Sequence, residues 1–195
     1  MSKDTRSRII ESAKRVVLEQ GLDHFTLVDV ADAAGVSKGG LLYHFPSKEA
    51  LVRGMLNDTL STFSDRMHAH AEQDAKPGRW IRAYVRATFP PARKNDRPDV
   101  AAAAVVAGIA TDRTLLQAYA EEAQKWTALL AGDDVDPLTV AVVRMAADGL
   151  WLNEALGLSP LSPDGREEFL KRLVDMTGAV GAAKKPARPR VPASA

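Results

Sequence analysis

A series of helix start and stop signals in the first 53 residues constrains this fold more than any other feature of the sequence. Apolar residues recur at helical spacing from Ile9 to Val17, and Gly21 suits the position just after the end of that helix. Thr26 suits the N-cap of a second helix, because an acid follows three residues later as in a short capping box, and Gly35 ends that helix. Two short helices joined by a tight turn at Gly35 are what a helix-turn-helix requires.

The third expected helix is short and contains residues that weaken it. Ser37 suits its N-cap, but Gly39 and Gly40 follow at once, each costing about 1 kcal/mol relative to Ala in a helix. Pro46 then stops the helix after about two turns. A helix this short does not form alone in water, so packing against neighbouring helices must hold it. The residues expected to pack in this way are Leu41, Leu42 and Phe45.

The two glycines remove side chains from the first turn of this helix, which lets its backbone approach another molecule closely. Backbone N–H groups at a helix start favour a phosphate. The whole chain carries a net charge of only +1, so the basic residues around this stretch are a local feature. Donors on the same surface are Lys38, Tyr43, His44 and Lys48. A DNA backbone and groove edge fit this arrangement better than a small ligand does.

The stretch TLVDVADAAGVSKGGLLYHFPSKEAL (26–51) resembles the DNA-binding domain of the tetracycline-repressor (TetR) family of bacterial transcriptional regulators. The resemblance covers roughly residues 5–53, where the caps, the turn glycine, the Tyr-His-Phe run and the Ser-Lys-Glu start match in order. It implies that residues 37–44 form the recognition helix. It also implies phosphate contacts for Thr26, Tyr43 and Lys48, and positions near bases or the adjoining backbone for Lys38, Gly39 and His44.

Gly40 departs from commoner members of this family, which often have a larger residue there. Fewer side chains are then available to read bases, so the operator sequence is not readable from the chain. Together, the pattern and the resemblance give eight DNA-binding residues: Thr26, Ser37, Lys38, Gly39, Gly40, Tyr43, His44 and Lys48.

Composition excludes several other classes of protein. The 195 residues are 46% hydrophobic, enough to bury a core. The absence of Cys excludes disulfides, Cys–metal sites and thiol catalysis, and it fits a reducing cytoplasm. No apolar run approaches the ~18–20 residues of a membrane span, and the charged N-terminus has no signal-peptide core. We therefore expect a cytoplasmic protein that does not associate with membranes.

From about residue 54 the pattern changes to longer helices with little strand character, which predicts an all-α fold. We expect a helix-turn-helix domain over residues 1–53, a helical effector-binding and dimerisation domain over 54–181, and a disordered basic tail over 182–195. The longer helices are expected over 80–89, 101–110, 115–130, 138–156 and 166–180.

The helix expected over 138–156 is apolar on two faces, so both faces must be covered. One stripe, which runs from Val140 to Leu150, can meet its own domain, and the other can meet a second copy, as the resemblance implies. The alternative is a helix that lies wholly inside a monomer. The residues expected at a dimer interface are Leu138, Val142, Met145, Gly149, Leu170, Leu173 and Thr177.

Aromatic residues of the second domain are candidates for the effector pocket that the resemblance implies, although aromatics at helical spacing are more often core. The expected pocket residues are Trp80, Tyr84, Thr88, Phe89, Tyr119, Trp126, Trp151 and Asn153, with Asp148 as a further polar candidate. Three arginines fall opposite the Trp80 face and are expected to be solvated: Arg79, Arg82 and Arg86.

A metal site and an enzyme are less well supported by the sequence. His68 and His70 stand two residues apart and would point away from each other on a helix, which argues against metal binding. The chain shows no nucleophile–base pair and no phosphate loop, and we expect no cofactor. The favoured function is a dimeric repressor that a small apolar or aromatic effector releases from an inverted-repeat operator in double-stranded DNA. A regulator without an effector, or an enzyme with an attached DNA-binding domain, remains the alternative.

Overall fold

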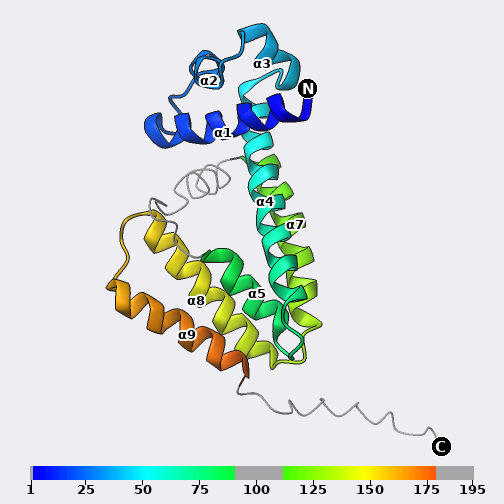
Figure 1. The fold of residues 1–195 in the computed structure, drawn as a ribbon, viewed down its shortest axis with the longest axis vertical. Coiled ribbons are helices and arrows are strands. Elements are labelled where there is room, and N and C mark those ends of the chain that lie inside the picture. The colour runs from blue at the N-terminus through cyan, green and yellow to red at the C-terminus, as the bar shows by residue number, and fades with distance from the viewer. Residues whose placement is uncertain (1, 91–111, 179–195) are drawn as a thin grey trace, which may run out of the picture.

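The long helix α4 (Lys48–Glu72) connects the two ends of the molecule (Figure 1). The computed structural model describes residues 2–90 and 112–178, and in these residues it is helical and has no strands, which confirms the all-α class. Three helices gather at the start of α4: α1 (Ser2–Gln20), α2 (Leu27–Ala34) and α3 (Lys38–His44). Helix α7 (Arg113–Ala131) runs beside α4, and three helices lie towards the other end of α4: α5 (Arg79–Thr88), α8 (Pro137–Ala155) and α9 (Pro163–Gly178).

Local signals determine the helix ends in the head, which we define as α1, α2, α3 and the first turns of α4. Thr26 caps α2 with a full capping box, and Ser37 and Ser47 cap α3 and α4 by accepting backbone N–H bonds. Gly35 follows α2 in the left-handed region at φ 62°, where glycine carries no steric penalty. The helix-turn-helix predicted from these signals is confirmed.

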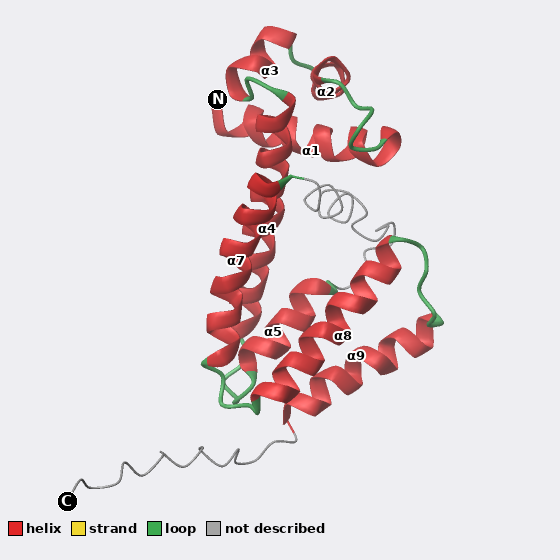
Figure 2. Cartoon of the chain, turned by 180° about the vertical axis from the view of Figure 1, so that it is seen from behind, coloured by secondary structure: helices red, strands yellow, loops and turns green. Residues whose placement is uncertain are grey.

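The body, which we define as the rest of α4 with α5, α7, α8 and α9, is a layered helical bundle. Helices α4 and α7 run side by side, and α5 packs between α4 and α8, while α9 covers α8 and α5 (Figure 2). None of the described helices is both long and apolar enough to cross a membrane. The helix expected over 101–110 and the tail expected over 182–195 lie outside the described residues.

Buried apolar side chains along α4 join the cores of the head and the body. Leu51 and Met55 are buried among the head helices, and Leu60 and Met67 continue the same core into the body. The boundary expected between residues 53 and 54 therefore lies inside one continuous helix. A change in the tilt of α4 would move the head relative to the body, because a helix transmits a displacement along its length.

Candidate functional site

Helix α3 lies on the outside of the head, with one face packed against the core and the other exposed to solvent. Leu41 and Phe45 are buried and anchor it to the core, whereas Leu42 is only half-buried. Tyr43 is 83% exposed, and its ring meets the His44 ring edge-on at a centroid distance of 5.2 Å. Packing therefore stabilises a helix of seven residues that would not form alone, and it leaves the tyrosine free for a partner.

The Thr26 and Ser37 hydroxyls, both expected at the DNA surface, act as helix caps. Thr26 Oγ1 accepts from Asp29 N at 3.2 Å and donates to an Asp29 carboxylate oxygen at 2.7 Å. Hydrogen bonds from the Thr26 side chain and backbone hold the pKa of Asp29 below its usual value. Ser37 Oγ accepts from Gly40 N at 3.0 Å. These bonds fix the starts of α2 and α3 and so set the positions of both helices.

The two glycines of α3 differ in what a side chain would meet. A Cβ at Gly40 would come within 3.3 Å of Ser37 Oγ, the atom that caps the helix. A Cβ at Gly39 would meet nothing within 4 Å, and the residue is exposed. No contact among the described residues therefore explains the absence of a side chain at Gly39, whereas the close approach of another molecule would.

Lys48, expected to contact a phosphate, also holds the head together. Its Nζ donates to the backbone oxygens of Asp23 and Phe25, both at 2.9 Å, and lies 4.3 Å from the centre of the Phe25 ring. An ammonium has three N–H donors, so one remains available for a partner. Lys48 therefore links the turn before α2 to the start of α4.

Two arginines that sequence reasoning missed line a hollow beside α3. Arg6 lies over the Phe45 ring at 5.0 Å, and Arg53 stands on the first turns of α4. Together with His44 and Asn57 they border a hollow of about 400 Å³ between the starts of α1 and α4. Residues 1–15 carry five basic and two acidic side chains, a signal that could have pointed to Arg6, whereas no pattern in the sequence singles out Arg53.

Three of the expected pocket aromatics meet in the body and are joined by one that was missed. This aromatic cluster consists of Phe63, Tyr84, Tyr119 and Trp126. The Phe63 ring centroid lies 4.6 Å from that of Trp126 and 5.2 Å from that of Tyr84, and Tyr119 meets Trp126 at 6.3 Å. Phe63 comes from α4, so the cluster touches the helix that carries the head.

Polar groups at the edge of the aromatic cluster tie it to its surroundings. Trp126 Nε1 donates to Ser64 Oγ at 2.8 Å, and Ser64 donates to Glu122 at 3.0 Å, which links α7 to α4. On the other side, the Tyr84 hydroxyl donates to Asp148 Oδ1 at 2.6 Å. Burial raises the pKa of Tyr84, so the hydroxyl stays protonated and keeps donating.

The other expected pocket residues lie outside the ring contacts of the aromatic cluster. Asn153 is exposed and donates to Gly149 O of its own helix. Trp80 meets the His68 ring at 5.2 Å. Phe89 is covered by the Arg166 guanidinium at 5.2 Å. Thr88 donates to Tyr84 O within α5, and Trp151 is half-buried on α8.

The two apolar faces expected on α8 are both present. Val143 and Ala147 are buried in the protomer core, whereas Leu138 and Met145 are 72% and 73% exposed. Val142, Leu152 and Leu156 continue the exposed stripe, and Gly149 and Leu170 are half-buried. Leu173 and Thr177 are buried inside the protomer, so their assignment to a surface for a second copy is wrong.

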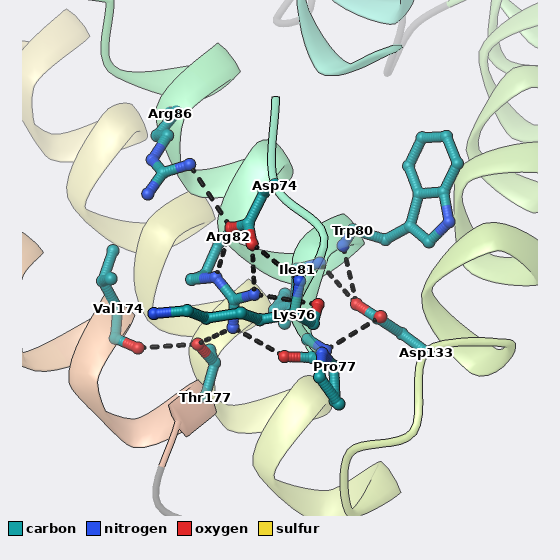
Figure 3. A network of polar contacts seen from close by, with 11 residues as sticks. Asp74, Lys76, Pro77, Trp80, Ile81, Arg82, Arg86, Asp133, Val174 and Thr177 are labelled. Atoms are coloured by element: carbon teal, nitrogen blue, oxygen red, sulfur yellow. Dashed lines mark hydrogen bonds and ion pairs between the residues drawn. The ribbon is translucent and has the colours of Figure 1, made fainter. Parts of the chain in front are cut away.

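A buried polar network corrects the expectation that Arg82 is solvated (Figure 3). Its guanidinium makes two bonds to Asp74, and Arg86 lies 3.6 Å from the same carboxylate but is exposed, as is Arg79. Asp133, from the loop after α7, accepts from the backbone N–H groups of Gly78, Trp80 and Ile81 and so caps α5 from a distance. Within the described residues, no group of three or more His, Asp or Glu side chains could hold a metal ion.

Comparison with known families matches both parts of the molecule. Residues 9–55 match the family described as bacterial regulatory proteins, tetR family. Residues 78–178 match the family described as tetracyclin repressor-like, C-terminal domain. The first match covers most of the head, and the second covers α5 to α9.

Individual relatives are similar over part of their length. The HTH-type transcriptional regulator TtgR of Pseudomonas putida is 34% identical over 73 residues, which are 37% of this chain and 35% of TtgR. RutR of Escherichia coli strain K12 is 38% identical over 89 residues, 42% of each chain. The match thus spans less than half the length of these curated relatives.

Solved structures are similar over nearly the whole chain. The multidrug binding protein EbrR complexed with imidazole has a TM-score of 0.66 and 25% identity, and the match covers 92% of this chain and 93% of that one. A TetR transcription regulator from Haloarcula marismortui has a TM-score of 0.72 at 17% identity, covering 91% and 98%, which shows a shared fold.

Proposed function

Because the chain belongs to the tetR family of bacterial regulatory proteins, we propose that it is a DNA-binding repressor that works as a dimer and is released from its operator by a small effector. The observation that carries this proposal is the outward face of α3. Lys38, Gly39 and Tyr43 are exposed there, while Leu41 and Phe45 anchor the helix. A helix exposed in this way can enter the major groove of DNA. Because a bacterial operator lies in the cytoplasm, the protein would act there.

The exposed stripe on α8 supports the dimer. Leu138, Val142 and Met145 are exposed to solvent in the single chain, and a second copy related by a twofold axis would cover them. Two heads would then read the halves of an inverted repeat, with their α3 helices ~34–36 Å apart or somewhat more.

The contact between the aromatic cluster and α4 supports release by an effector. Phe63 lies on α4, and Trp126 is hydrogen-bonded to Ser64 of the same helix. A compound that prefers a different arrangement of these rings would change the tilt of α4 and hence the spacing of the heads. Its effect on DNA affinity cannot exceed its differential affinity for the two arrangements. EbrR, a multidrug binding protein of the same fold, fits such a use of the body.

Selection of an operator from a random pool of duplex DNA tests the DNA-binding part of the proposal. Lys38→Ala should then weaken binding and reduce the salt dependence by about one phosphate contact. Lys171→Ala, which removes another exposed lysine, from α9, is the matched control and should change neither quantity. If both variants bind like the native protein, α3 is not the DNA-reading element.

The release step is tested by screening small aromatic compounds for loss of operator binding. Trp126→Ala and Tyr84→Ala should alter the response to a releasing compound and leave operator binding near normal. If both variants keep the full native response, the effector binds elsewhere. If no compound releases the DNA, the regulator works without an effector.

A further inference from the structure

The Arg144 guanidinium of α8 lies between an aromatic ring and a carboxylate at the edge of the aromatic cluster. Its central carbon is 5.5 Å from the centre of the Tyr84 ring, and its Nε is 3.8 Å from Asp148 Oδ2. Its Nη1 donates to Thr127 Oγ1 of α7 at 2.7 Å. The protein thus places a positive group of its own where a ring face and a negative charge meet.

The carboxylate and the guanidinium are held with different strength. The Tyr84 hydroxyl fixes Asp148 with a bond of 2.6 Å, whereas the 3.8 Å contact to Arg144 is too long for a hydrogen bond. The Arg144 guanidinium is also the end of a long, flexible side chain. Displacing the guanidinium therefore breaks its hydrogen bond to Thr127 but none to the carboxylate, which Tyr84 keeps in place.

A purely apolar compound bound beside Asp148 would leave its carboxylate without a favourable partner. Its side chain is 47% exposed, yet the surrounding protein desolvates it enough to raise its pKa above the usual value. Among the described residues, its oxygens receive one hydrogen bond, from Tyr84, and the loose contact to Arg144. A compound that displaced Arg144 without bringing a positive charge would leave the carboxylate without a counter-charge.

We propose that the effector is an aromatic organic cation, whose positive group takes the place of the Arg144 guanidinium over Tyr84 and beside Asp148. Its aromatic part lies against the aromatic cluster. The regulatory effect of the bound cation rests on the proposed function, but its binding to the protein does not depend on DNA. An anionic compound would instead pair with Arg144 and compete with Asp148 for the guanidinium. Preferential binding of an anion would therefore contradict the proposal.

Calorimetric titration of the full native chain with three probes of similar shape tests the sign of the charge. The probes are (3-hydroxyphenyl)trimethylammonium, its neutral isostere 3-tert-butylphenol, and the anion 3-hydroxybenzoate. The cation should bind about tenfold more tightly than the neutral isostere, within the range of a partly desolvated cation–π contact with a nearby charge. Equal or tighter binding of the neutral or anionic probe overturns the inference, and so does binding by none of the three.

Two substitutions with opposite expected effects locate the site. Asp148→Asn should remove the preference for the cation over its isostere. Arg144→Gln should tighten binding of the cation several-fold, because the internal competitor is gone. Glu167→Gln, which removes an exposed carboxylate from α9, is the charge-matched control and should leave cation binding unchanged. Circular dichroism establishes that each variant is folded.

These outcomes separate the inference from the proposed function. Weaker cation binding in Arg144→Gln, or an unchanged preference in Asp148→Asn, overturns the site even if the protein binds an operator. Cation binding that follows both variants as expected supports the site, and a failure of the same cation to release DNA would then count against the repressor mechanism alone.

Discussion

Arg82 and Asp74 form a two-bonded ion pair buried where α4 meets α5. Arg82 Nε and Nη2 donate to the two Asp74 carboxylate oxygens at 2.7 and 3.0 Å. The remaining N–H groups donate to Lys76 O, Pro77 O and Thr177 Oγ1. All five donors of the guanidinium are used, so the pair joins the end of α4 to the end of α9 (Figure 3).

Asp74→Asn should destabilise the protein by about 3 kcal/mol at pH 7, because it leaves the Arg82 charge buried without its counter-charge. Urea unfolding followed by circular dichroism measures this free energy. Glu168→Gln breaks an exposed pair with Arg172 and serves as the control, which should leave the free energy of unfolding unchanged.

The effect of Asp74→Asn should also depend on pH. The hydrogen bonds from Arg82 lower the pKa of Asp74 to about 2. A carboxyl whose pKa is lowered by folding contributes stability above its unfolded pKa, and that contribution is lost as the pH falls through the folded value. The difference between native protein and variant should therefore shrink as the pH is lowered from about 4 towards 2. A difference that stays constant over this range would show that the pair does not stabilise the fold through its charge.

Gly54→Ala should destabilise the head by about 1–3 kcal/mol, although alanine is the better helix former. A Cβ at this buried position of α4 would lie 2.6 Å from Phe45 Cε1, and Phe45 anchors the end of α3. Gly39→Ala is the matched control: its Cβ meets open space and alanine is the better helix former, so it should raise the stability by up to about 1 kcal/mol. In a DNA-binding assay Gly39→Ala should nevertheless weaken operator binding, because the backbone could no longer approach as closely.

Tyr43→Ala and Lys48→Ala should both weaken operator binding, but only Lys48→Ala should also destabilise the fold. Tyr43 is exposed, so its loss should lower DNA affinity and leave the unfolding free energy unchanged. Lys48 also donates to two backbone oxygens of the head, so its loss should cost about 1 kcal/mol of stability as well. Equal stability of both variants in urea would mean that Lys48 does not hold the turn before α2.

Met145→Glu should give monomers that bind the operator poorly, because it places a charge in the stripe proposed to meet a second copy. Light scattering at micromolar concentration reads the mass directly. Leu116→Glu changes an exposed leucine on α7 and is the control, which should remain dimeric. A native protein that is monomeric under these conditions contradicts the dimer itself.

The sequence alone determined the features that depend on neighbours along the chain. The caps at Thr26 and Ser37 act within three residues of themselves, so their pattern predicted where α2 and α3 begin. The period of the apolar residues predicted the two faces of α8 in the same way, because a helix repeats every 3.6 residues whatever surrounds it.

Only the tertiary structure decided which distant side chains meet. Arg82 looked solvated because its partners Asp74 and Thr177 stand 8 and 95 residues away, and Asp133 caps α5 from 52 to 55 residues away. Phe63 joined Tyr84 and Trp126 for the same reason. Hydrophobic burial is non-directional, so a sequence indicates which side chains leave water, and the packing of whole helices then decides which of them come into contact.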